Sequence, residues 1–421
     1  MEQENIRMSI SRNVLDYYIE NKDGCERFYS AANNEFIKEI YDDISDDAVI
    51  IELLSRVSIV ILTANKYEKN ILHHLYSKGI KRSIPRWRIK LTSDIIDPQM
   101  TQGFYMKWGD YSVVHIEALS TGSHTRGGSA DLVRYLFDNA YIYPVAILSF
   151  GVCFGLDEAN YRLGDVIISE KLYPYFQGAK ITADEFYVND NNTFRIDNEL
   201  KFTVNRLFGD NILSEHRDRA FFKSYITGEA VLSNYEIRDK FAKAATNQPV
   251  VGGEMEGYGV FKECRGYFYN IPCMIIKSIC DWGVVKNLEQ QDIQDIIDTE
   301  TDENKKRILT EIKNSPIKEM IQAYTASRSF YILEKLLNID NHVFSVSVYD
   351  IAKEIIIRIR DETNDKVVST EQIHEKLNNS GFFTRFNRIP SQQYIEQIIE
   401  DMISDRLVYR DDDSGNLLIT D

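Results

Sequence analysis

The sequence predicts an α/β protein with a helical extension before the main domain and a small added module after it. Short apolar runs such as Val57–Leu62 and Val145–Phe150 have the composition of buried strands and are followed by glycine-containing turns or by helical spacing. The last part of the chain has the pattern of two helices and a hairpin. Strands that alternate with helices favour a sheet covered by helices, so the central part should be an α/β domain.

Length and composition indicate two or three domains and a large core. The chain has 421 residues, of which 43% are hydrophobic and 27% charged, as in soluble globular proteins. Its longest apolar runs have about eight residues, too few to cross a bilayer, and no apolar stretch follows the acidic N-terminus. We therefore expect a cytoplasmic protein without a signal peptide or a membrane contact.

Cysteine spacing and net charge narrow the range of partners. The five cysteines are scattered without metal-ligand or CxxC spacing, so free thiols are expected and neither a metal nor another cofactor is predicted. A formal net charge of −16 argues against general nucleic-acid binding. It leaves an anionic substrate open, because a local basic pocket is enough to bind one.

Residues 1–55 are predicted to form a helical extension. Two groups of apolar residues have the spacing of a helix face: Val14, Leu15, Tyr18 and Ile19, and then Phe36, Ile37, Ile40 and Tyr41. The segment carries no chemical motif, so it is a candidate surface for homo-oligomer formation or for a partner. Residues 56–340 are predicted to be the α/β domain, with a polar insertion at Val284–Ser315.

Residues 341–421 are predicted to form a winged-helix-like module. The expected elements are a helix at Val348–Arg358, a capping signal at Ser369–Gln372, a helix at Ser391–Ser404 and a closing hairpin. Acidic residues outnumber basic ones from Lys366 to the end. Because phosphate contacts require basic side chains, the module suits a protein partner better than DNA.

Two basic stretches stand out in this acidic chain. The segment Lys81–Lys90 carries Arg82 and Arg86 and no acid, and is either a charged strand edge or a site for phosphate groups. The glycine-rich loop around His124 and Arg126 lies between a predicted strand and a helix, where backbone N–H groups can bind an anion.

The stretch Pro249–Gly283 organises the chemistry. It contains Gly252-Gly253, which suits a turn or a close backbone approach, then Glu254 and Glu256 around Met255, a helix at Tyr258–Tyr267 and a strand at Cys273–Ile276 that leads to Asp281 and Trp282. Ligands of α/β sheets lie outside the carboxyl ends of the strands, so Glu256 and Asp281 are candidates for one site. The alternative is a helix start with first-turn acids and an N-cap aspartate.

The segments Gly253-Glu254-Met255-Glu256-Gly257 and Ser278-Ile279-Cys280-Asp281-Trp282 resemble motifs of the nucleoside phosphorylase/nucleosidase superfamily, which includes the methylthioadenosine/S-adenosylhomocysteine nucleosidases. The family shows Val-Glu-Met-Glu and Ile-Ser-Asp, so Gly253 and Cys280 are departures. Gly151–Leu156 and Gly164-Asp165-Val166 also resemble its turn and following strand start. The resemblance covers about 57–338 and implies an α/β/α sandwich with a mixed central sheet.

The resemblance implies three catalytic roles. Asp281 corresponds to the acid that protonates N7 of the leaving purine, and Glu256 to the carboxylate that binds the sugar hydroxyls, with Met255 packed on the sugar. Glu68, in the helix after the first strand, corresponds to the glutamate that orients the attacking water; the alternative is an ordinary first-turn acid. The reaction passes through an oxocarbenium-like sugar.

Further residues are expected around the substrate: Glu254, Val152, Cys153, Phe154, Val231, Leu232 and Trp282. Val231 stands where the family often stacks an aromatic on the purine. Val152 and Phe154 replace residues that tend to be Ser and Gly in nucleosidases, so we expect a bulkier and less polar wall. That exchange disfavours a thioadenosine substrate.

The resemblance implies a purine N-glycosyl hydrolase. Family phosphorylases carry Gly-Asp-Pro and an Arg after the first strand, whereas this chain has Thr63–Glu68, and a carboxylate there repels phosphate but can activate water. The basic stretches and added modules favour ATP or dATP, cleaved to adenine and (deoxy)ribose triphosphate by a regulated bacterial antiviral effector. The alternatives are an AMP or methylthioadenosine/S-adenosylhomocysteine nucleosidase, and a non-catalytic nucleotide sensor.

Overall fold

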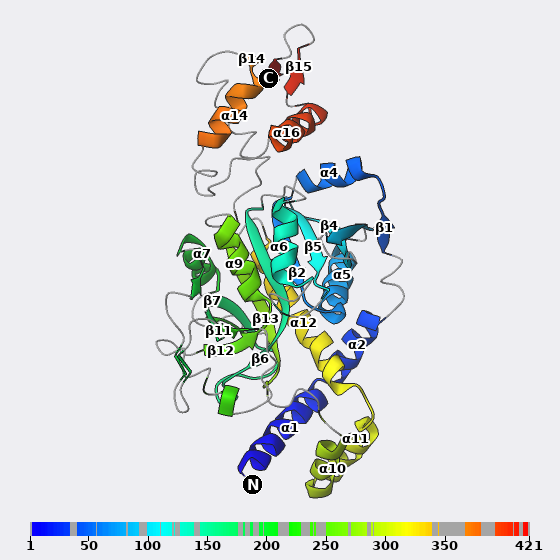
Figure 1. The fold of residues 1–421 in the computed structure, drawn as a ribbon. Coiled ribbons are helices and arrows are strands. Elements are labelled where there is room, and N and C mark those ends of the chain that lie inside the picture. Colours follow the sequence, from blue (N-terminus) through cyan, green and yellow to red (C-terminus); the bar gives the residue numbers. More distant parts are fainter. Residues whose placement is uncertain are drawn as a thin grey trace.

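A mixed eleven-stranded sheet forms the centre of the computed structural model (Figure 1). The structure describes residues 2–33, 40–55, 57–80, 83–91, 99–109, 111–119, 122, 127–138, 144–175, 180–181, 186–187, 193–196, 198–208, 219–228, 236–238, 240, 250–267, 271–283, 288, 290–338, 344, 367–379, 392–406, 408–411 and 416–419. The α/β class with a mixed central sheet is therefore confirmed.

The strands run in the order β1 (Tyr41–Asp43), β3 (Ile84–Leu91), β4 (Gln99–Trp108), β5 (Tyr111–Glu117), β2 (Ile59–Thr63), β6 (Ala146–Gly155), β12 (Val250–Glu254), β11 (Ala220–Thr227), β7 (Val166–Pro174) and β10 (Phe194–Arg195). The expected hairpin appears as the antiparallel pair β4–β5. A separate two-stranded sheet joins β8 (Lys180–Ile181) to β9 (Phe186–Tyr187).

One strand closes part of this sheet into a ring. β13 (Cys273–Asp281) pairs in parallel with β6 and antiparallel with β7, while β6 also pairs with β12, β12 with β11, and β11 with β7. β13 and β6 are both longer than the runs predicted from the sequence, because each continues beyond its apolar segment. As a result, Asp281 is the last residue of a strand and not the N-cap of a helix.

Helices cover both faces of the sheet. On β2, Ile59 and Ile61 belong to one apolar cluster, whereas Val60 and Leu62 belong to the other, as expected for alternating side chains. The first cluster contains residues of α5 (Lys66–Ile80), α7 (Asn198–Phe208) and the C-terminal part of α12 (Ile317–Leu336). The second contains residues of α6 (Ser129–Asp138) and α9 (Gly257–Tyr267). The predicted layering of helices on both sides of a sheet is thus present.

The N-terminal extension is mostly helical, as predicted, and contains α1 (Glu2–Glu20), α2 (Lys22–Asn33) and α4 (Asp47–Ser55). One expectation was wrong: Tyr41 lies in β1, which pairs in parallel with β3, and not on a helix face. Tertiary pairing overrides the local apolar spacing there, because the sheet satisfies backbone groups that a short helix would leave exposed. Phe36 and Ile37 lie outside the described residues.

The predicted insertion at Val284–Ser315 contains α10 (Gln290–Thr299) and α11 (Glu303–Ile312), which lie beside α1 at one end of the molecule (Figure 1). Arg7 on α1 makes a two-bond ion pair with Asp292 on α10, at 3.0 and 2.9 Å. Lys305 on α11 lies 2.5 Å from Asp16 on α1. These pairs attach the N-terminal extension to the insertion.

The described C-terminal elements are β14 (Val367–Val368), α14 (Thr370–Asn379), α16 (Gln392–Ser404), β15 (Val408–Arg410) and β16 (Leu417–Ile419). The strands form a sheet in the order β14-β16-β15. The capping signal is confirmed, since Ser369 Oγ accepts from the N–H of Gln372 at 3.2 Å and the Gln372 side chain accepts from the N–H of Ser369 at 2.9 Å. Residues 348–358 lie outside the described part.

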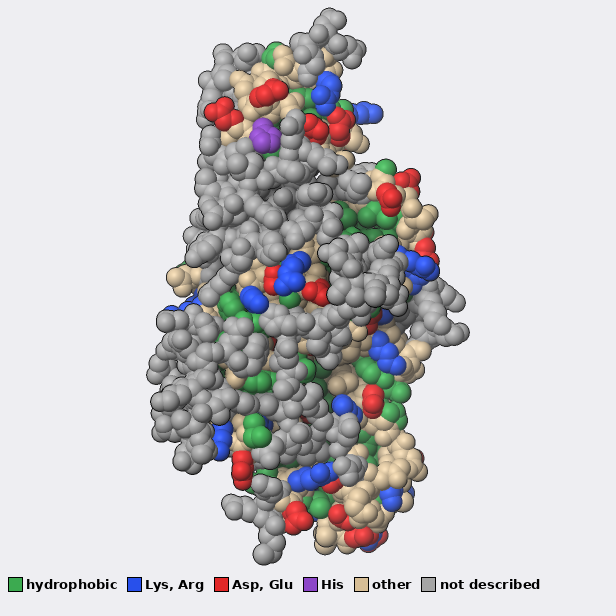
Figure 2. Space-filling view, in the orientation of Figure 1, with side chains coloured by type: hydrophobic (Ala, Val, Ile, Leu, Met, Phe, Trp, Pro, Cys, Tyr) green, Lys and Arg blue, Asp and Glu red, His purple; other side chains and the backbone are tan. Residues whose placement is uncertain are grey.

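The distribution of surface charge and the state of the cysteines agree with what the sequence predicts. On the face drawn in Figure 2, the described acidic and basic side chains are interspersed and do not form one broad basic area. All five cysteines are free and buried. No helix within the described ranges is long and apolar enough to cross a membrane.

Candidate active site

A buried lysine lies at the centre of the candidate site. The Nζ of Lys277, on β13, is 2.5 Å from Glu256 Oε2 and 3.4 Å from Glu254 Oε2, and its side chain is 1% exposed. Glu256, Glu254 and Glu68 together raise the pKa of Lys277 against the opposing effect of burial, so the side chain is a permanent cation. Three carboxylates around one ammonium leave an excess of negative charge.

Glu254 and Glu256 are brought together by the junction of β12 and α9. Glu254 Oε2 accepts from the N–H groups of Glu256 at 2.9 Å and Gly257 at 2.8 Å, so it satisfies donors at the start of α9. Burial raises the pKa of Glu254, opposed by Lys277. Glu254 therefore caps α9 from the end of β12, and neither glutamate lies in the first turn of the helix, so the first-turn-acid alternative was wrong. Glu256 extends to Lys277.

Glu68 is held by backbone N–H groups at two separate places, the turn after β2 and strand β6. Its Oε2 accepts from Ala64 N–H at 2.7 Å, and its Oε1 accepts from Val152 N–H at 2.9 Å. A Cβ at Gly151 would lie 2.1 Å from Glu68 Oε1, so only glycine lets the carboxylate approach β6. Burial raises the pKa of Glu68 to about 7, with Lys277 lowering it and Glu256 raising it. Glu68 is therefore part of the same charged cluster and titrates near neutral pH.

Asp281 ends β13 at the other side of the site. It is 8% exposed, and its Oδ1 accepts from the N–H of Gly283 at 2.7 Å. It stands four positions after Lys277, which on a regular strand corresponds to roughly 13 Å. That length is on the scale of a purine joined to a sugar. β6 runs beside β13 over this interval, with Gly151 opposite Lys277 and Phe154 opposite Asp281.

Trp282 is placed differently from the prediction. Its side chain has no exposed surface, and its indole N–H donates to Asn13 Oδ1 on α1 at 3.0 Å. A Cβ at Gly155 would lie 2.4 Å from the ring, which shows how closely the indole packs on β6. The tryptophan therefore connects the strand end that carries Asp281 to the N-terminal helix and lines no open surface in this structure.

Gly252 and Gly253 lie within β12, so the expectation of a turn was wrong and the alternative, a close approach, was right. A Cβ at Gly253 would lie 2.0 Å from Cζ of Phe154. Phe154 is 8% exposed and belongs to an apolar cluster with Leu156 and Tyr173. Two departures from the family pattern are thus linked, because the ring of Phe154 fills the space that a side chain at position 253 would need.

The other expected wall residues lie around the same strands. Val152 and Cys153 follow Gly151 on β6, Val152 being partly exposed and Cys153 buried, and burial raises the pKa of the Cys153 thiol. Met255 is partly exposed between the two glutamates. The glycine-rich loop enters α6 here, because Ser129 Oγ donates to the carbonyl of Glu256 at 2.6 Å.

Several predicted residues are not tested by the structure. His124, Arg126, Arg82, Val231 and Leu232 lie outside the described residues. Arg86 is on β3, three strands from β2 in the sheet order, and its guanidinium binds Asp43 at 2.6 and 2.9 Å. Within one chain it is not brought to the carboxylate cluster. The alternative of a charged strand edge was wrong, because β3 pairs with β4 on one side and with β1 on the other.

Sequence reasoning missed Lys277, Arg238 and Asn13. Lys277 interrupts an apolar strand, and a lysine at a buried strand position is a signal that a carboxylate faces it. Arg238 is 1% exposed and donates to the carbonyl of Trp282 at 2.7 Å. Nothing in the local sequence marks Arg238 or Asn13, since their partners are distant in the chain. No cluster of three potential metal ligands is found in the described part of the chain.

Comparison with known proteins supports the resemblance. Residues 133–312 match the sequence model of the phosphorylase superfamily, over less than half of the chain. A death domain-containing ATP nucleosidase from Amphimedon queenslandica is 25% identical over 206 residues, which are 44% of this chain and 37% of the relative. The chain thus spans little more than a third of that relative.

The solved structures to which the chain is similar include a nucleosidase and a hydrolase. The methylthioadenosine/S-adenosylhomocysteine nucleosidase of Colwellia psychrerythraea, in complex with adenine, is 14% identical, with a TM-score of 0.45 over 69% of this chain and 98% of its own. Futalosine hydrolase of Helicobacter pylori is 13% identical, with a TM-score of 0.45 over 67% of this chain and 98% of its own.

Proposed function

We propose that this protein is a hydrolase that cleaves the N-glycosidic bond of a purine nucleotide. The observation that carries the proposal is the buried cluster of Glu68, Glu254 and Glu256 around Lys277, with Asp281 at the far end of the same strand. The transition state of this reaction places positive charge on the sugar. A buried group of carboxylates with excess negative charge stabilises such a charge, because it is preorganised in a site with little water.

Each carboxylate takes one role in the proposal. Asp281 donates a proton to N7 of the leaving purine, Glu256 accepts hydrogen bonds from the sugar hydroxyls, and Glu68 orients and deprotonates the attacking water. The pKa of about 7 for Glu68 suits a general base near neutral pH. Lys277 holds Glu256 and Glu254 in place, and it lowers the pKa of Glu68 and so opposes the effect of burial.

Water is favoured over phosphate as the nucleophile. An incoming phosphate dianion would meet three carboxylates and one ammonium, so its approach is electrostatically unfavourable. Water carries no such cost. We therefore expect base release that is independent of inorganic phosphate and leaves the sugar with a free hydroxyl at C1. In phosphate buffer, a product with a new phosphate on C1 of the sugar would instead indicate a phosphorylase.

ATP or dATP is the favoured substrate. The relative from Amphimedon queenslandica is named an ATP nucleosidase, and the glycine-rich loop that enters α6 beside Glu256 carries Arg126. In this proposal Arg126 binds the phosphate chain, with His124 beside it and Arg82 or Arg86 reaching in from a neighbouring subunit. The added modules at both ends suit a regulated effector of bacterial antiviral defence that forms homo-oligomers and contacts a protein through residues 341–421.

One assay tests the activity and the substrate together. The full-length protein is incubated with ATP, dATP, AMP, adenosine and methylthioadenosine, and free adenine is measured. We expect adenine from ATP or dATP, and a loss of about 100-fold or more in Asp281→Asn, which keeps the shape but cannot donate the proton. Arg126→Ala should raise KM for ATP and leave the cleavage of adenosine unchanged.

The competing proposals make different predictions in the same assay. A non-catalytic nucleotide sensor would bind nucleotides and release no adenine from any of them. A thioadenosine or AMP nucleosidase would prefer methylthioadenosine or AMP over ATP, and Arg126→Ala would then affect all substrates alike or none.

A further inference from the structure

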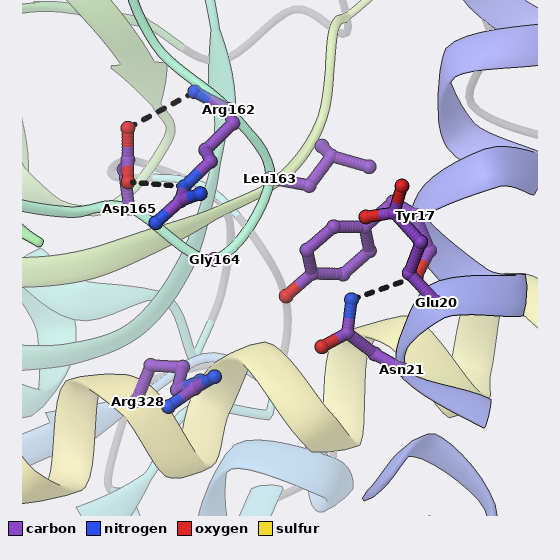
Figure 3. A pocket seen from close by; sticks show the side chains of 8 residues that line it. All are labelled: Tyr17, Glu20, Asn21, Arg162, Leu163, Gly164, Asp165 and Arg328. Carbon is purple, nitrogen blue, oxygen red and sulfur yellow. Dashed lines mark hydrogen bonds and ion pairs between the residues drawn. The ribbon is translucent and has the colours of Figure 1, made fainter. Parts of the chain in front are cut away.

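A polar cavity separate from the carboxylate cluster lies between α1, the turn before β7 and α12. It has a volume of about 150 Å³ and is lined by Tyr17, Glu20, Asn21, Arg162, Leu163, Gly164, Asp165 and Arg328. Figure 3 shows Tyr17, Glu20 and Asn21 entering from one side, and Arg162, Asp165 and Arg328 from the others. None of the proposed catalytic residues lines it.

The charges of this cavity favour an anion. Arg162 and Arg328 contribute two guanidinium groups. The buried carboxylate of Asp165 is already compensated by Arg219 at 2.8 Å and by the N–H of Arg162 at 3.0 Å. The Arg162 guanidinium also lies 3.7 Å from Asp165. Because Arg219 neutralises Asp165 from outside the lining, the two lining arginines, Arg162 and Arg328, leave a local positive excess beside Glu20 in a chain of net charge −16. Such a site binds a small anion where the surrounding protein would repel it.

The neutral groups indicate what else the ligand carries. Burial raises the pKa of Tyr17, so its hydroxyl stays a protonated donor, and a Cβ at Gly164 would lie 2.5 Å from that oxygen. Arg328 is oriented by Tyr324, whose hydroxyl accepts at 2.8 Å. On the same side as Tyr17, Glu20 offers an acceptor. The Asn21 amide already donates to the carbonyl of Tyr17 at 2.8 Å and accepts from the Tyr324 hydroxyl at 3.2 Å, so its second N–H is the donor that it offers. A ligand with an anionic end and hydroxyl groups matches both sides.

The walls of the cavity are connected to the proposed catalytic residues. Gly164 N–H donates to the carbonyl of Ile279 at 2.8 Å, and Ile279 N–H donates to the carbonyl of Asp165 at 2.9 Å, two residues before Asp281. On α12, the residue after Arg328 is Ser329, whose hydroxyl donates to the carbonyl of Gly151 at 2.8 Å, beside the Glu68 carboxylate.

α1 supplies a third connection, because it carries Tyr17 in the cavity and Asn13, which accepts from Trp282 at 3.0 Å. Three separate elements thus meet at the cavity, and each continues to a residue next to Asp281 or Glu68. A ligand that bridges them would restrict their relative motion and preorganise the proposed catalytic groups.

We propose that this cavity is an effector site for a small phosphate ester of sugar size. The phosphate lies between Arg162 and Arg328, with Tyr17 and Asn21 as further donors, and a hydroxyl group of the ligand donates to Glu20. A cavity of about 150 Å³ holds a molecule the size of benzene, so a phosphate with a few attached atoms fits. Since the side chain of Arg162 is 57% exposed, the cavity reaches the surface and the rest of the ligand extends into solvent.

Calorimetric titration of the full-length protein with ribose 5-phosphate tests the site. Arg162→Gln and Arg328→Gln should each weaken binding at least tenfold, since a charge-assisted contact is lost. Arg410→Gln, which removes a partly exposed arginine of the C-terminal module, and Glu256→Gln should leave the affinity within twofold. Ribose without phosphate should not bind detectably, and inorganic phosphate should bind at least tenfold more weakly than the ester.

The same titrations can overturn the proposal. Unchanged affinity in both arginine variants would contradict the site, and a loss confined to Glu256→Gln would assign the ligand to the carboxylate cluster. Equal affinity for inorganic phosphate and the ester would contradict the role of Glu20. Arg162 is largely exposed, so its variant should fold even if Arg328→Gln does not. These readouts require no catalytic activity and so remain valid if the proposed nucleosidase function fails.

The effector role itself rests on the proposed function. Saturating ribose 5-phosphate should raise kcat for adenine release at least twofold in the parent and not in Arg162→Gln. An unchanged kcat with intact binding would refute the effector role while leaving the site in place, and an absence of adenine release in every condition would refute the nucleosidase proposal instead.

Discussion

Lys277 Nζ lies 2.5 Å from Glu256 Oε2, and both side chains are almost completely buried. Glu256 lies in the junction between β12 and α9, whereas Lys277 lies on β13, so the pair joins the motif after β12 to the strand that ends in Asp281. The proposed sugar-binding carboxylate is therefore positioned by a cation that stands four residues before the proposed acid.

Replacing that cation tests the pair. Lys277→Met leaves Glu254 and Glu256 buried without their partner, so we expect the free energy of unfolding to fall by about 3–5 kcal/mol. Lys277→Arg should recover part of the loss, because it keeps the charge. Lys201 on α7 is the control, because its side chain is 41% exposed and pairs with Glu170 on β7, and Lys201→Met should cost less than about 1 kcal/mol. Urea denaturation measures all three, and a stable Lys277→Met would contradict the role of the cation.

The pH dependence of activity should report Glu68. Its pKa is raised to about 7 by burial, and the ionised form is the proposed base, so kcat should rise with pH through about 7. Lys277 lowers the pKa of Glu68, so Lys277→Met should move that rise to higher pH. A pH–rate profile of adenine release checks both statements. A profile that is flat between pH 6 and 8 would remove Glu68 as the titrating base.

The same group should affect stability with a defined sign. The folded state holds the proton of Glu68 more tightly than the unfolded chain, where the pKa is 4.5. Its contribution to the free energy of unfolding therefore decreases by roughly 3 kcal/mol as pH rises from about 4.5 to about 7. Glu68→Gln removes this term, so its stability relative to the parent should increase from pH 5 to pH 7.5. A relative stability that decreases over this interval would contradict the raised pKa.

Gly253 and Phe154 should be energetically coupled. Gly253→Val places a side chain in the space of the Phe154 ring, and overpacking of this kind costs about 1–3 kcal/mol. Phe154→Ala leaves a cavity and costs about 3–5 kcal/mol. In the double variant the valine enters the vacated space, so the total loss should be smaller than the sum by at least about 1 kcal/mol. Additive losses in a double-mutant cycle would show that the two sites are independent.

The contact between α1 and Trp282 should contribute to stability. Asn13→Leu leaves a buried indole N–H without its acceptor, at a cost of about 1–3 kcal/mol. Asn33→Leu, at the exposed end of α2, is the control and should change the free energy of unfolding by less than about 0.5 kcal/mol. Equal effects of the two substitutions in thermal denaturation would indicate that α1 does not dock on the strand end.

Much of the architecture could be predicted from the sequence, because it depends on short-range patterns. The apolar run before Thr63 and the helical spacing after Asn65 predicted β2 and α5, and the capping box at Ser369–Gln372 begins α14 as expected. The motifs around Glu256 and Asp281 resemble those of the superfamily whose sequence model matches residues 133–312. These features are local, since spacing along a strand or helix determines which side chains share a face.

Only the tertiary structure decided which residues meet across distant strands. It placed Tyr41 in a strand, Gly252 and Gly253 inside β12, and Arg86 against Asp43 on the outer part of the sheet. It also brought Lys277 to Glu256 and α1 to Trp282. Local spacing does not determine such pairs. The energy of a buried charge or of a closely packed glycine depends on a partner that is distant in the sequence and comes into contact only when the chain folds.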